Sequence, residues 1–157
     1  MKQEQQLRFL LNQETSSLQQ LENVLKQEYD ALMATNIEAI ESAISLKNQA
    51  LASQADATMS RKNFTTQLSV DHGDEGLQQL IASCDNSDEL AASIAGLTSL
   101  AKQCHDANRT NGRLIMEKQQ RAILALNIVR QTDNNLPVYS GQGKALNKPS
   151  SRSLGKA

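Results

Sequence analysis

Aromatic residues and prolines are scarce in this chain of 157 residues, which has no tryptophan, two phenylalanines and two tyrosines. A core of this size must then be built from Leu, Ile, Val and Ala, a composition that suits closely packed helices. The two prolines, Pro137 and Pro149, both come late, so the first 136 residues contain no helix breaker of this kind. With few strand-forming residues as well, the sequence predicts an all-α fold.

The sequence also lacks a strong charge of one sign, a long apolar run and a cysteine framework. The net charge of −1 argues against a nucleic-acid-binding surface across the whole domain. No apolar run approaches the roughly 18 residues that span a membrane, and residues 1–6 lack the apolar stretch of a signal peptide. Cys84 and Cys104 lie among apolar helical positions, so we expect buried thiols in a reducing compartment and a cytoplasmic protein.

Little in the sequence could carry out chemistry. Cys104 and His105 are adjacent on a predicted helix and diverge by about 100°, so they cannot ligate one metal ion together. No Ser-His-Asp grouping, phosphate-binding glycine loop or paired-carboxylate motif is present. We therefore expect no enzymatic activity, no metal and no cofactor. Phosphotransfer on His105 is an alternative, although Asp106 to Arg109 lacks the Lys and Gly that usually follow such a histidine.

Leucine at heptad spacing is the main positive signal. The first stripe steps by four and three through Leu7, Leu11, Leu18, Leu21, Leu25 and Leu32, with Glu14 and Glu28 at two positions of the same grid. A second heptad grid runs from Leu90 to Val129. Because a side chain repeated every 3.5 residues on average needs a facing helix to be buried, the pattern predicts a bundle of long antiparallel helices with coiled-coil-like packing.

Breaks in this pattern divide a helical bundle over 1–136 into helices at about 3–33, 36–69, 75–84 and 87–132. Thr35 and Glu38 have the spacing of a capping box at the first break. The second helix is expected to bury its isoleucines and leucine, Ile37, Ile40, Ile44 and Leu51, with Lys47 on the same line and Ala43 and Ala50 allowing close approach of a neighbour. Residues 137–157 hold Pro, Gly and four positive charges, which predicts a flexible basic tail.

Two features of the last helix leave alternatives open. Asn108 and Asn111 fall on its grid, where amides either fix the register of the bundle, which we favour, or form a polar notch for a partner helix. Residues 122–129 are apolar nearly all round, more than one facing helix can cover. Because Lys118, Arg121 and Arg130 flank this segment as a polar rim, an exposed surface for a partner helix is favoured over plain core.

The chain resembles flagellar export chaperones of the FlgN type. The resemblance is carried by Asn108-Arg109-Thr110-Asn111-Gly112-Arg113-Leu114-Ile115 and, past a helix, by Val138-Tyr139-Ser140-Gly141-Gln142-Gly143. Residues of the first two predicted helices are similar to the family as well: Leu25, Glu28, Leu32, Ile37, Ile40, Lys47 and Leu51. In this motif Asn108, Asn111 and Gly112 are the distinctive residues, together with the downstream tyrosine and Gly-x-Gly.

The resemblance implies a cytoplasmic chaperone of type III secretion. Such chaperones bind the C-terminal helical region of hook-associated (hook–filament junction) proteins, prevent their premature association and deliver them to the export gate. Cargo binding would fall on Ile115, Ala122, Ile123, Leu126 and Val129. Tyr139 matches the family's tyrosine for docking on the cytoplasmic domain of the gate. From the residues alone, a structural helical bundle or a self-associating coiled coil without chaperone activity remains the alternative.

Overall fold

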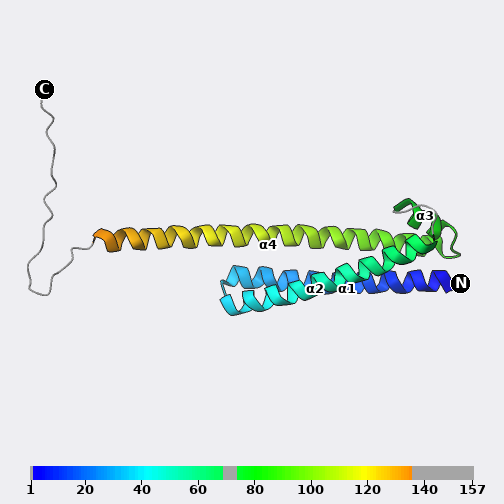
Figure 1. Cartoon of the computed structure of the whole chain (residues 1–157), viewed down its shortest axis with the longest axis horizontal. Coiled ribbons are helices and arrows are strands. Elements are labelled where there is room, and N and C mark those ends of the chain that lie inside the picture. Colours follow the sequence, from blue (N-terminus) through cyan, green and yellow to red (C-terminus); the bar gives the residue numbers. More distant parts are fainter. Residues whose placement is uncertain (1, 69–73, 136–157) are drawn as a thin grey trace, which may run out of the picture. The chain divides into compact units, whose positions relative to one another are not determined.

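The computed structural model describes residues 2–68 and 74–135 and places four helices in them (Figure 1). They are α1 (Lys2–Ala34), α2 (Ile37–Leu68), α3 (Asp74–Ala82) and α4 (Ser87–Asn135). The prediction of an all-α bundle of long helices is confirmed. The chain divides into two units, residues 1–116 and 117–157, so α4 contributes residues to both. No helix in the described ranges is both long and apolar enough to cross a membrane. The predicted tail at 137–157 and Tyr139 lie outside the described residues.

The core of the first unit follows the leucine stripe of α1. All eight grid positions of that stripe are buried, including the two glutamates: Leu7, Leu11, Glu14, Leu18, Leu21, Leu25, Glu28 and Leu32. α4 buries every seventh residue against it: Leu90, Leu97, Cys104 and Asn111. Cys104 Sγ donates to the Leu18 carbonyl and Asn111 Nδ2 to the Leu25 carbonyl, so residue numbers rise together along the two helices. α4 therefore runs alongside α1 in the same direction, whereas α1 and α2 are antiparallel (Figure 1).

α2 meets α1 through small residues and not through the isoleucines that the apolar pattern predicts. Ala43 and Ala50 are buried, while Ile37 is 69% exposed and Ile44 and Leu51 are exposed as well. The expected core stripe of α2 is therefore wrong at these positions. The physical reason for the difference is that neighbouring residues of a helix are separated by about 100°. When Ala43 and Ala50 contact α1, Ile44 and Leu51 are therefore turned away from α1. Small side chains on that line let the backbones of α1 and α2 approach closely.

The connection between α1 and α2 is tight and differs from the predicted capping box. The Asn36 amide donates to the Ala31 carbonyl and the Thr35 amide to the Leu32 carbonyl, a Schellman arrangement that ends α1 with Thr35 at φ 53°. Asn36 Oδ1 then accepts a hydrogen bond from the Ala39 amide and caps α2. Thr35 therefore ends the first helix, and Asn36 begins the second.

α3 closes one end of the first unit over the start of α4. Leu77 and Ile81 are buried in the same core as the α1 leucines, with Leu80 and Cys84 half-buried beside them. The Leu90 amide donates to the Asn86 carbonyl, which makes Asn86 the residue that caps the start of α4. The side chain of Asn86 donates to Glu4 on α1, so this short connection also ties the beginnings of α1 and α4 together.

Candidate functional site

A buried polar layer joins the three long helices of the first unit at the end distant from α3. The Glu28 side chain is completely buried, and its two oxygens accept from different helices. Lys47 Nζ of α2 donates to Oε1 at 2.6 Å, and Asn111 Nδ2 of α4 donates to Oε2 at 2.9 Å and to the Leu25 carbonyl at 2.8 Å. One carboxylate thus fixes the positions of α2 and α4 on α1. A buried amide bonded across two helices is the geometry expected if Asn111 fixes the register of the bundle.

A second polar layer lies about four turns earlier on α1. Glu14 is buried, and its carboxylate accepts from Arg61 Nε and from the Thr58 hydroxyl at 2.6 Å, both on α2. Among the described residues, no buried side-chain nitrogen or oxygen lacks a hydrogen-bond partner. Because a buried ion pair with missing partners is strongly destabilising, the complete pairing of both layers selects one alignment of α1 against α2.

The other two residues of the Asn-x-x-Asn-Gly motif are placed differently from Asn111. Asn108 is exposed, so the expectation that both amides lie on the buried seam is wrong for this one. Ala107, which is half-buried, lies on one side of the line from Cys104 to Asn111, and the exposed Asn108 lies on the other side. Gly112 is half-buried, and a Cβ built on it would meet nothing within 4 Å. The packing of the first unit does not require glycine there.

The described part of the second unit is a stretch of α4 that exposes large apolar side chains. Five of them are 57–66% exposed: Ile123, Leu124, Leu126, Ile128 and Val129. Ala122 is exposed too, whereas Ile115 belongs to the first unit and is half-buried. Helix formation itself follows from the composition, since Ala and Leu are strong helix formers. Contiguous apolar side chains at the surface typically mark a site of interaction with another protein.

Charge is distributed unequally between the two units. Residues 1–116 contain nine basic and fifteen acidic residues, a net charge of −6, and residues 117–157 contain seven basic and two acidic residues, a net charge of +5. Arg121 and Arg130 are exposed at the ends of the apolar segment. None of the ion pairs found within residues 2–68 and 74–135 involves either arginine. The apolar surface is thus bordered by cations that can meet acidic groups of a partner.

The histidine and cysteine side chains of the described residues do not gather at one site. His105 is exposed and lies 3.6 Å from Asp106 of the same helix, while the neighbouring Cys104 is buried. Both cysteines are free thiols, and burial raises the pKa of Cys84 and of Cys104 above the ordinary 9.0. In the described ranges, no group of three His, Cys, Asp or Glu side chains is placed to hold a metal ion. His72 lies outside those ranges.

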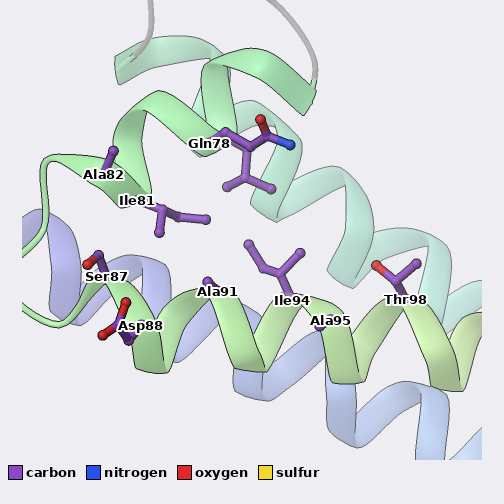
Figure 2. Close-up of a pocket in the computed structure, with 10 residues that line it drawn as sticks. Gln78, Ile81, Ala82, Ser87, Asp88, Ala91, Ile94, Ala95 and Thr98 are labelled. Carbon is purple, nitrogen blue, oxygen red and sulfur yellow. The ribbon is translucent and has the colours of Figure 1, made fainter.

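A groove of about 660 Å³ lies between α3 and the first turns of α4. Ile81 of α3 and Ile94 of α4 point into it from opposite sides, and Ala91 and Ala95 form part of its floor (Figure 2). The polar groups on its rim, Gln78 and Asp88 among them, do not converge on one point (Figure 2). The groove results from small side chains between two helices and lacks the convergent polar groups of a typical ligand pocket.

Comparison with known proteins gives one informative result. Neither a search of curated proteins nor a search of solved structures found a match. The model of the FlgN family, described as FlgN protein, matches residues 1–147 and thus nearly the whole chain. The chain belongs to the FlgN family, whose members are chaperones of flagellum biogenesis.

Proposed function

We propose that this protein is a cytoplasmic chaperone of flagellar type III secretion that binds the C-terminal helical region of a hook-associated protein. The observation that carries the proposal is the exposed apolar segment of α4, residues 122–129, in a chain of the FlgN family. A cargo helix with an apolar stripe would dock on Ala122, Ile123, Leu126 and Val129. The two apolar surfaces would then cover each other until export.

Burial of apolar surface supplies the free energy of this capture without a nucleotide. Transferring a large aliphatic side chain from full exposure to a buried interface contributes about 1.5–3 kcal/mol. Ile123, Leu126 and Val129 are each more than half exposed, so each retains most of this contribution for binding. Much of this favourable free energy is offset by the translational and rotational entropy that the two molecules lose on binding, and this loss limits the affinity.

The first unit holds its own part of α4 through the polar layer at Glu28. Asn111, buried at 1% exposure and bonded to Glu28 and Leu25, fixes the position of α4 on α1 six residues before the second unit begins. Asn108 and Gly112, the other family-motif residues, do not take part in this anchoring. We assign delivery to Tyr139, which by resemblance to the family would dock on the cytoplasmic domain of the export gate.

The proposal is tested by Leu126→Asp with Asn127→Asp as its matched control. Both variants introduce the same charge at adjacent exposed positions of α4, and only the first removes an apolar side chain. Leu126→Asp should abolish binding of the C-terminal segment of a hook-associated protein, and Asn127→Asp should retain it, with helical circular dichroism unchanged in both. Retained binding by Leu126→Asp would refute the assigned surface, and loss of helix content would make Leu126 a core residue.

Delivery is tested separately by Tyr139→Ala. This variant should bind cargo as the unmodified chain does but support less secretion of the hook-associated protein into the medium of growing cells. Loss of cargo binding in the purified variant would contradict the division between a cargo surface on α4 and a gate contact at Tyr139. The alternative of a purely structural coiled coil predicts a concentration-dependent mass and no cargo binding, which sedimentation of the chain alone and with cargo distinguishes.

A further inference from the structure

The exposed apolar side chains of α4 lie on two opposite faces of the helix. Successive residues of an α-helix are rotated by about 100°, so Leu124 and Leu126 are about 160° apart around its circumference. Leu124 is 63% exposed and Leu126 is 57% exposed. The segment therefore presents large apolar side chains in two opposite directions.

The surface assigned to cargo covers only one of these faces. Ala122, Ile123, Leu126 and Val129 fall within an arc of about 120°, close to the width that one facing helix covers. Leu124 lies outside this arc, and the exposed Ile128 follows it by four residues on the same side. A single cargo helix on Leu126 would leave Leu124 in water, so complete coverage needs a second helix.

Charge limits which segments can supply that second helix. Residues 136–157 contain four basic residues and no acidic one, so this tail and the cationic ends of the segment at Arg121 and Arg130 repel each other. The same α4 segment of another copy is repelled in the same way, because residues 117–157 carry a net charge of +5. The complementary occupant is apolar on one side and acidic along its edges.

We propose that residues 122–129 are enclosed between two amphipathic helices of one partner, whose acidic side chains meet Arg121 and Arg130. This inference rests on the proposed function and extends it, since one cargo helix covers the Leu126 face and a second helix of the same cargo molecule covers the Leu124 face. Two-sided enclosure buries the whole apolar circumference of the segment.

Two matched alanine variants of the full chain test the inference, Leu124→Ala and Leu126→Ala, with Asn127→Ala as control. Alanine removes the same apolar side chain on each face and preserves the helix. The probe is the full-length hook-associated protein that the unmodified chain binds, measured by titration calorimetry. Enclosure predicts that each leucine variant weakens binding by about tenfold or more and that Asn127→Ala changes it little. Affinity should also fall with added salt and in Arg121→Glu.

The possible results separate the inference from the function that it extends. If only Leu126→Ala weakens binding, the cargo occupies one face, and the enclosure is refuted while the chaperone function stands. If the unmodified chain binds no hook-associated protein, the proposed function itself fails. If the chain alone is a dimer in sedimentation and Leu124→Ala makes it a monomer, a second copy occupies that face. Affinity that does not change with salt would refute the acidic edges.

Discussion

Replacing Lys47 with methionine removes the cation beside a carboxylate that has no access to water. The Glu28 side chain is completely buried, and the Lys47 ammonium lies 2.6 Å from its Oε1. Methionine fills a similar volume, so the main change is the loss of charge. Breaking a buried ion pair by removing one partner costs about 3–5 kcal/mol, because the remaining charge stays buried without compensation. Asn111 still donates to Oε2, which favours the lower end of this range.

Urea unfolding followed by circular dichroism measures this loss. With an m value of about 2 kcal/mol/M, Lys47→Met should lower the midpoint by roughly 1.5–2.5 M. Lys62→Met is the control, since it removes the same charge from an exposed position of the same helix and should shift stability by less than about 0.5 kcal/mol. Glu28→Leu combined with Lys47→Met should recover only part of the loss, because Asn111 Nδ2 then keeps its bond to the Leu25 carbonyl but loses the one to Glu28. Equal midpoints for Lys47→Met and Lys62→Met would refute the role assigned to the pair.

Two further predictions concern single residues of the first unit. Gly112→Ala should raise the free energy of unfolding by about 0.5–1 kcal/mol, because the added Cβ meets nothing within 4 Å and alanine loses less backbone entropy than glycine in a helix. A loss of stability would show that the position is crowded. Arg8 lowers the pKa of the exposed Glu89 below the ordinary 4.5 through its hydrogen bond and then its charge. A carboxylate with a lowered pKa stabilises the folded state above its unfolded pKa, and this stabilisation is lost as the pH falls through the folded pKa. The small difference in melting temperature between the unmodified chain and Arg8→Gln should therefore be present at neutral pH and disappear well below pH 4.5. A difference that is the same at every pH would contradict this.

The leucine stripe of α1 could be predicted from the sequence because it is strictly periodic over seven turns or more. Leu7 to Leu32 supplies a core residue at every grid position, and the structure buries all of them. The two glutamates on this grid are buried with the leucines. Their partners could not be predicted, because the alignment of α2 against α1 decides whether Glu28 meets Lys47, and that alignment depends on contacts between distant segments.

The buried faces of α2 and α4 were harder to predict, because the apolar residues of each helix lie on more than one face. On α2, Ala43 and Ala50 made the closer contact with α1, so the larger isoleucines, which hydrophobicity alone favours, lie outside the core. On α4, the strict grid correctly selects Asn111 but wrongly includes Asn108, which lies on the exposed side of the line from Cys104 to Asn111. The apolar residues 122–129 follow no single face, and this departure from the grid marks them as candidates for binding a partner.

Titration calorimetry of the unmodified chain against the C-terminal helical segment of a hook-associated protein from the same organism tests the central claim most directly. We expect one-to-one binding with a negative heat-capacity change, since an apolar surface is removed from water. The absence of binding, by calorimetry and by a second method, for every hook-associated protein of that organism would contradict the assignment of the exposed α4 segment to cargo.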